Sequence, residues 1–231
     1  MIEFIFMLTH NDATVPNALE VLAEVQHAGL RYIGFKDIGQ PPEVLAEIAA
    51  RSHDAGLEVM LEVVSTSVED ELSSVRAAVD IGVDWVLGGT NPGEAGALLA
   101  GTDVRYCPFP GTIVGHPSVL KGAPQAIAAH AGELTVRPGV HGVDLLAYRH
   151  ADTDPVSLTR QVVQAASGPV IVAGSIVGAD QIRAVEEAGA WGFTIGGAIF
   201  EKRLPGAPSV REQVERVLAI DVVADGARVR R

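Results

Sequence analysis

A unit made of an amphipathic helix, a glycine and a short apolar strand recurs along almost the whole chain. The glycines that close the helices are Gly29, Gly56, Gly82, Gly101, Gly132, Gly168 and Gly189. Glycine is favoured there because the residue after a helix commonly adopts a left-handed conformation, in which a Cβ atom is strained. The pattern therefore predicts helices and strands that alternate regularly.

Eight apolar strands are predicted, one ahead of the first helix and one after each glycine. They are Ile2–Leu8, Tyr32–Asp37, Val59–Val64, Trp85–Gly88, Val104–Cys107, Val143–Tyr148, Val170–Ala173 and Phe193–Ile195. Strands that are apolar on both faces and separated by helices are typical of a parallel sheet covered on both sides. Eight such units in 231 residues favour a single-domain α/β fold, the closed (β/α)8 barrel, which usually takes about 250 residues.

An open, doubly wound sheet is the competing architecture. Its dinucleotide-binding form carries G-x-G-x-x-G after the first strand, whereas Thr9-His10-Asn11-Asp12 stands there in this chain. The barrel is therefore expected over residues 1–220. Helical periodicity is lost from Asp221 onward, so residues 221–231 are predicted to form a frayed tail.

Composition narrows the class of protein. No apolar run approaches the roughly 20 residues that span a bilayer, and the first eight residues lack a basic leader and a cleavage site. A single cysteine, Cys107, excludes an internal disulfide. The formal charge of −12 has the wrong sign for binding nucleic acid or an anionic membrane. We expect a cytoplasmic protein with a small-molecule partner, and a homo-oligomer is compatible with these features.

Turns that contain glycine follow the last two predicted strands. The seventh strand leads into Gly174-Ser175, and the eighth into Gly196-Gly197 and a short segment, Ala198–Glu201. Phosphate groups need several backbone N–H donors at close approach, and glycines with the start of a short helix supply them. The alternative is that these glycines serve only tight turns.

The segment from Gly168 to Glu201 resembles the phosphate-binding (β/α)8 barrels. This superfamily includes ribulose-phosphate epimerase, N-acetylmannosamine-6-phosphate epimerase and the phosphoribosyl isomerases of histidine and tryptophan biosynthesis. The resemblance covers about the last 35 residues of the barrel. It implies that the phosphate group is bound by Gly174, Ser175, Gly196 and Gly197.

Catalytic residues of such a barrel lie at the carboxyl ends of the strands. Lys36 and Glu62 end neighbouring apolar strands, and adjacent strands lie about 4.8 Å apart. The two side chains can therefore meet if both point inward, as a catalytic pair or as a structural salt bridge. His10 and His116 are further catalytic candidates, His116 on a proline- and glycine-rich loop after the fifth strand.

Other polar residues at strand ends are candidates for substrate binding. Arg149 can bind a carboxylate or phosphate, or pair with a nearby aspartate, and Tyr148 can donate a hydrogen bond. Gly88-Gly89 precede Asn91 and form a possible second anion site. The candidates in this group are Asp37, Asn91, Tyr148 and Arg149.

These residues lead to four hypotheses of function. The first is an enzyme that isomerises or epimerises a small phosphorylated sugar, or a related carbonyl compound, by proton transfer next to the carbonyl. The second is a lyase, either a Schiff-base aldolase or a decarboxylase that uses Lys36. The third is metal-assisted epimerisation, which needs no organic cofactor but uses a divalent metal held by His10, Asp37 and His116. The fourth is a ligand-binding barrel without catalysis.

Overall fold

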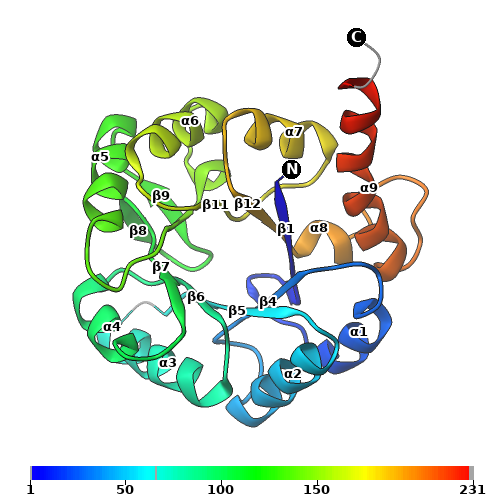
Figure 1. Cartoon of the computed structure of the whole chain (residues 1–231), viewed down its shortest axis with the longest axis horizontal. Helices are drawn as coiled ribbons and strands as arrows, with labels where there is room; N and C mark the ends of the chain where they lie inside the picture. The colour runs from blue at the N-terminus through cyan, green and yellow to red at the C-terminus, as the bar shows by residue number, and fades with distance from the viewer. Residues whose placement is uncertain (1, 66, 229–231) are drawn as a thin grey trace.

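The computed structural model describes residues 2–65 and 67–228, with side chains described as far as Ile220 (Figure 1). The strands of its main sheet are β1 (Glu3–Met7), β4 (Tyr32–Lys36), β5 (Glu58–Val63), β6 (Trp85–Gly88), β7 (Arg105–Cys107), β10 (Val143–Leu145), β11 (Val170–Val172) and β12 (Gly192–Ile195). They pair in the order β10-β11-β12-β1-β4-β5-β6-β7, and every pair is parallel. All eight predicted strands are present, with ends shifted by up to three residues.

The two outer strands of this sheet, β7 and β10, come together and close it. The N–H of His141 donates to the carbonyl of Tyr106 at 2.8 Å, and the N–H of Asp144 donates to the carbonyl of Pro108 at 3.0 Å. The predicted single-domain (β/α)8 barrel is therefore confirmed.

Helices surround the strands in a ring (Figure 1). They are α1 (Ala18–Val25), α2 (Pro42–Asp54), α3 (Val68–Ile81), α4 (Pro92–Leu99), α5 (Pro124–Thr135), α6 (Pro155–Ala165), α7 (Ala179–Glu187) and α9 (Val210–Arg228). Among the described residues, no helix is long and apolar enough to cross a membrane. Helix α9 runs through most of the segment expected to be a tail, and residues 229–231 lie outside the described part of the chain.

Shorter elements occupy the carboxyl-terminal end of the barrel. They are the hairpin of β2 (Thr9–His10) and β3 (Ala13–Thr14), the hairpin of β8 (Thr112–Val114) and β9 (Val119–Lys121), the 3-10 helix η1 (Ala147–Arg149), and α8 (Gly197–Phe200). Helix α8 lies inside the ring of helices next to β1, where the rings of Phe6 and Phe200 stack with centroids 6.0 Å apart (Figure 1).

Five of the seven predicted helix-closing glycines adopt left-handed conformations, and two differ. Gly132 lies within α5, where a Cβ atom would stand 3.1 Å from the carbonyl oxygen of Ala165. Gly168 has no left-handed conformation, and a Cβ atom there would overlap the carbonyl of His141. At both positions glycine permits close approach of another backbone, a requirement that helical periodicity does not reveal.

The interior of the barrel is filled by alternate residues of the strands. This inner core consists of Ile5, Met7, Tyr32, Met60, Trp85, Leu87, Cys107 and Ile171. Lys36 and Glu62 are register partners on β4 and β5. Because successive side chains alternate between faces, these two residues lie on the same face as Tyr32 and Met60. The strand geometry therefore points both charged groups into the barrel at its carboxyl-terminal end.

Candidate functional site

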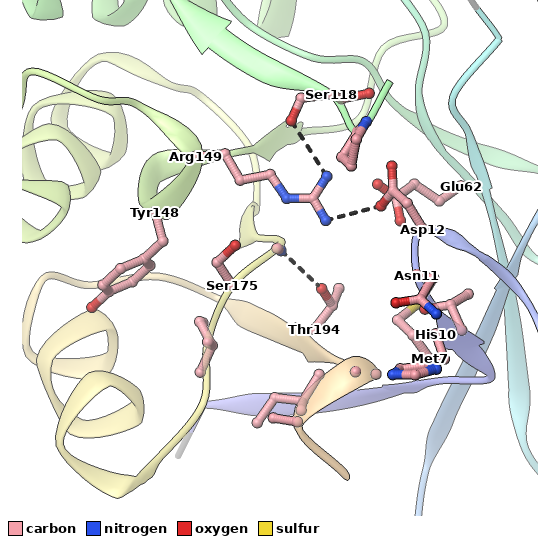
Figure 2. A pocket seen from close by; sticks show the side chains of 18 of the residues that line it. Met7, His10, Asn11, Asp12, Glu62, Ser118, Tyr148, Arg149, Ser175 and Thr194 are labelled. Atoms are coloured by element: carbon pink, nitrogen blue, oxygen red, sulfur yellow. Dashed lines mark hydrogen bonds and ion pairs between the residues drawn. The ribbon is translucent and has the colours of Figure 1, made fainter. Parts of the chain in front are cut away.

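A cavity of about 610 Å³ opens at the carboxyl-terminal end of the barrel (Figure 2). Its walls come from the ends of β1, β4, β5 and β12, the β2–β3 hairpin, η1, and the start of α8. The predicted site residues that line it are His10, Lys36, Glu62, Tyr148, Arg149, Gly174, Ser175, Gly196 and Gly197. The structure thus brings together residues from the first, second, third, sixth, seventh and eighth strands of the barrel.

The predicted meeting of Lys36 and Glu62 is confirmed. Both side chains are buried, and Lys36 Nζ lies 3.4 Å from Glu62 Oε2. Lys36 Nζ also contacts Asp12 Oδ1 at 2.5 Å. The amine is therefore held between two carboxylates at the floor of the cavity.

Asp12, which the sequence analysis did not select, is the centre of the charged network. Besides Lys36 it binds Arg149, whose Nη2 lies 2.9 Å from Oδ1, and its Oδ2 faces His116 Nδ1 at 3.6 Å. Figure 2 shows Arg149 reaching across the cavity to this carboxylate. Lys36, Arg149 and His116, from different parts of the chain, thus converge on one buried acid.

The turn between β2 and β3 places Asp12. Asn11 and Asp12 have φ values of 50° and 64°, a left-handed pair that forms a tight hairpin turn. Asn and Asp tolerate this conformation better than most residues. The Asn11-Asp12 pair, a few residues after the first strand, is the sequence feature that indicates this hairpin.

The charge environment keeps Asp12 ionised. Burial of the carboxyl group opposes ionisation, but the hydrogen bonds and positive charges of Arg149 and Lys36 outweigh it and lower the pKa of Asp12 to about 2. Asp12 is therefore a permanent anion near neutral pH.

Arg149 crosses the cavity close to the backbone of Gly174. A Cβ atom at Gly174 would overlap Arg149 Nε, so glycine is needed here for the arginine to pass. Arg149 Nη1 also donates to the carbonyl of Ser118 at 3.3 Å. This hydrogen bond connects the turn between β8 and β9 to the site. Gly174 therefore positions the guanidinium group.

The remaining glycines and Ser175 surround one wall of the cavity. Gly174 and Ser175 have φ values of 76° and 60°. Gly196 and Gly197 begin α8, where the N–H of Ile199 donates to the carbonyl of Gly196 at 2.9 Å. The N–H groups that precede it at the start of a helix have no acceptor within the helix. A Cβ atom at Gly196 would lie 2.5 Å from Thr9 Oγ1, whereas one at Gly197 would meet only His10 Cδ2, at 3.9 Å. Gly196 is thus required by packing, and Gly197 faces open space.

His10, His116 and Tyr148 lie around the cavity. His10 Nε2 is 3.5 Å from Glu201 Oε1, and both residues line the cavity. Tyr148 also lines it, and its pKa is raised by burial and by the charge of Asp154. His116 reaches the site through its contact with Asp12.

Two expected substrate-binding residues point elsewhere, which corrects their assignment. Asp37 accepts hydrogen bonds from the N–H of Val64 at 3.1 Å, Ser65 Oγ at 2.6 Å and Ser74 Oγ at 2.8 Å. It follows the inward-facing Lys36, so alternation turns it to the outer face. The metal set of His10, Asp37 and His116 is therefore not assembled, and no group of three His, Cys, Asp or Glu suited to a metal ion occurs among the described residues.

Asn91 is occupied by an internal carboxylate. Its Nδ2 donates to Glu71 Oε2 at 2.7 Å, and the backbone N–H groups of Thr90 and Asn91 donate to Glu71 at 2.9 and 2.8 Å. Glu71 is itself buried. The anion site expected after Gly88-Gly89 is thus filled by the chain's own side chain.

Asp144 on β10 is a second buried acid that the sequence analysis missed. Its neighbours Val143 and Leu145 belong to the outer core, so Asp144 faces the barrel interior. Its side chain is fully buried, and neither carboxyl oxygen has a hydrogen-bond partner among the described residues. Burial, and then the charge of Glu62, raise its pKa well above the ordinary value. Burial therefore favours the protonated form of Asp144.

This raised pKa predicts a pH effect on stability. Because folding favours protonated Asp144, the wild type loses unfolding free energy as pH rises above about 4, by up to about 1.4 kcal/mol per pH unit. Asp144→Asn removes this loss, so the variant should gain stability relative to wild type as pH rises. Urea denaturation from pH 3 to 8 measures the difference. The exposed Asp103 provides a control in Asp103→Asn, and a constant difference for Asp144→Asn would contradict the prediction.

Comparisons with known proteins bear on the fold. No family model and no curated protein matches the sequence. Orotidine 5′-phosphate decarboxylase from Pyrococcus horikoshii OT3 matches with a TM-score of 0.65 and 14% identity, over 94% of this chain and 98% of that chain. The native KDPGal structure matches with a TM-score of 0.65 and 14% identity, over 97% and 95% of the two chains.

A variant of the citrate synthase SbnG has a TM-score of 0.59 and 9% identity, over 98% of this chain and 94% of that chain. At such identities the similarity establishes architecture and nothing about the reaction. The chain is similar to these proteins as a (β/α)8 barrel.

Proposed function

We propose that this protein is an enzyme that acts on a small phosphorylated sugar or related carbonyl compound. It moves a proton at the carbon next to the carbonyl, which results in isomerisation or epimerisation. The observation that carries the proposal is the buried pair of Lys36 and Glu62 in a cavity that also contains Ser175 and Gly197. A base, an acid and an anion-binding wall are thus within one cavity.

Glu62 acts as the base and Lys36 as its electrophilic partner. A carboxylate beside the substrate carbon removes the proton, and an ammonium group stabilises the negative charge that develops on the carbonyl oxygen. Lys36 Nζ lies 2.5 Å from Asp12 Oδ1 and 3.4 Å from Glu62 Oε2. An amine that contacts two carboxylates is less free to attack a substrate carbonyl, so this geometry supports proton donation over an aldolase mechanism.

The substrate phosphate binds between Ser175 and the start of α8. Support comes from the left-handed backbone of Gly174-Ser175 and the open N–H groups of the first turn of α8. Both segments line the cavity that holds Lys36 and Glu62. The bound phosphate thereby fixes where the reacting carbon lies relative to Lys36 and Glu62.

Gly197→Val should weaken the binding of inorganic phosphate by about tenfold or more, since the side chain would fill the space above the open N–H groups. Only His10 Cδ2 lies within 4 Å of the Cβ position, so the fold should tolerate the change. Isothermal titration calorimetry with phosphate measures the effect. Gly178→Val is the matched control, because nothing lies within 4 Å of that Cβ position at the start of α7. Unchanged affinity in Gly197→Val would place the phosphate elsewhere.

A decarboxylase that uses Lys36 as the acid is the second candidate. Support comes from the position of Lys36, which lines the cavity next to Asp12 and Glu62 and can donate a proton to a carbanion there. Such an enzyme would release carbon dioxide and then protonate the resulting carbanion.

Substrate identification separates these reactions. A thermal-shift screen against sugar phosphates selects ligands, because binding to the native state raises the apparent stability. Incubation of each ligand in deuterated water then reveals deuterium next to the carbonyl if the enzyme is an isomerase or epimerase. Carbon dioxide release would instead identify the decarboxylase, and borohydride trapping of Lys36 would identify the aldolase.

A further inference from the structure

We propose that the substrate carries one phosphate group and no second anionic group, so that its reacting end is an uncharged hydroxy-carbonyl. The inference rests on the proposed function and specifies its substrate class. It follows from the ion pairing of the side chains around the cavity.

The basic side chains that line the cavity already have carboxylate partners. Among the described lining residues these are Lys36, Arg149 and the imidazole of His10. Lys36 contacts two acids, at 2.5 and 3.4 Å. Arg149 contacts Asp12 at 2.9 Å, and His10 lies 3.5 Å from Glu201. A second anionic group on the substrate would therefore find its natural partners occupied.

Acidic groups outnumber the permanent cations around this space. Asp12, Glu62 and Glu201 line the cavity, against Lys36 and Arg149. Asp12 and Glu62 are buried. A substrate carboxylate that took over Lys36 or Arg149 would leave a buried acid without its partner, and separating a buried ion pair is costly.

Uncharged polar groups fit the same surroundings. An ammonium group has three donors, so Lys36 can donate to a carbonyl oxygen while it keeps its acidic partners. Carboxylate oxygens of Asp12 and Glu62 can accept from substrate hydroxyl groups. Oδ2 of Asp12 is buried and has no hydrogen-bond partner among the described residues. Its contact with His116 Nδ1, at 3.6 Å, is longer than a hydrogen bond, so this oxygen can still accept from a substrate hydroxyl group.

Two ligands that differ only at the end remote from the phosphate test the inference. Glycerol 3-phosphate ends in a hydroxymethyl group, and 3-phosphoglycerate ends in a carboxylate on a three-carbon chain of the same length. Calorimetry at pH 7.5 should show glycerol 3-phosphate binding at least tenfold more tightly. Asp12→Asn removes one acidic partner from both Lys36 and Arg149. The ratio of the two affinities in this variant should therefore approach one. Using the ratio within one protein cancels any partial loss of folded material.

The control variant is Asp37→Asn, which makes the same change in charge outside the cavity and should keep the wild-type ratio. Equal or tighter binding of 3-phosphoglycerate by the wild type would overturn this inference while leaving the phosphate site intact. The same ratio in Asp12→Asn and Asp37→Asn would overturn the cause assigned to it. If inorganic phosphate and both esters fail to bind, the proposed phosphate site and this inference fail together.

Discussion

Replacing Glu62 by glutamine is expected to lower kcat/KM by roughly 10²–10⁴-fold, the range typical for loss of a general base. Glutamine keeps the size of the side chain and its ability to hydrogen-bond Lys36, but it cannot accept a proton from carbon. The affinity for inorganic phosphate should stay unchanged, because the phosphate site proposed at Ser175 and α8 lies on another wall of the cavity (Figure 2). The rate of deuterium incorporation next to the carbonyl measures the loss.

Glu58→Gln is the matched control, since Glu58 lies on the same strand at its opposite end. It bonds Trp85 Nε1 at 3.0 Å and Arg105 at 3.1 Å, away from the cavity. Lys36→Arg should also be inactive, because a guanidinium group does not exchange a proton near neutral pH. Deuterium exchange that persists at the wild-type rate in Glu62→Gln would refute the assigned base and direct attention to His10 or His116.

Removing the carboxylate at the centre of the network should strongly destabilise the protein. Asp12→Ala leaves Arg149 without its acidic partner and Lys36 with Glu62 alone. Breaking a buried ion pair on one side typically costs roughly 3–5 kcal/mol. Urea denaturation at pH 7 should show a loss of that order. Asp180→Ala is a contrasting control, because Asp180 pairs with Arg183 at 3.0 Å on the surface, where such pairs contribute less than about 1 kcal/mol.

The stabilising effect of Asp12 should also depend on pH. Its pKa is lowered from 3.8 to about 2 by folding, so its contribution is fully present above pH 4 and is lost as pH falls through 2. The difference in stability between wild type and Asp12→Ala should therefore shrink on acidification, by about 2 kcal/mol. A difference that stays constant from pH 7 to 2 would contradict the ion-pair explanation.

The sequence predicts the barrel well because its strands are apolar on both faces and its helices end at left-handed glycines. It also predicts that Lys36 and Glu62 can meet, because they end neighbouring apolar strands. The structure establishes that both side chains point inward. Alternation of side chains along the strand explains the position of Asp37. This residue is adjacent to Lys36 and therefore faces the opposite way.

Asp12 and Asp144 escaped detection for two different physical reasons. Asp12 lies in a hairpin turn, and its importance arises from Arg149, which is 137 positions away along the chain. Asp144 lies inside an apolar strand, where periodicity alone does not distinguish a buried acid from an interruption of the core. Contacts between distant segments, not local patterns, determine both residues.

The carboxylate of Glu71 occupies the turn after β6 and competes there with anions from solution. Glu71 supplies, from within the chain, the negative charge that the turn after β6 would otherwise attract from solution. An intramolecular ligand is present at high effective concentration, so free anions do not displace it readily. Of the two turns with paired glycines, the one at α8 is the one where we propose that an external anion binds. The occupied turn after β6 therefore agrees with the proposal that the substrate carries a single phosphate.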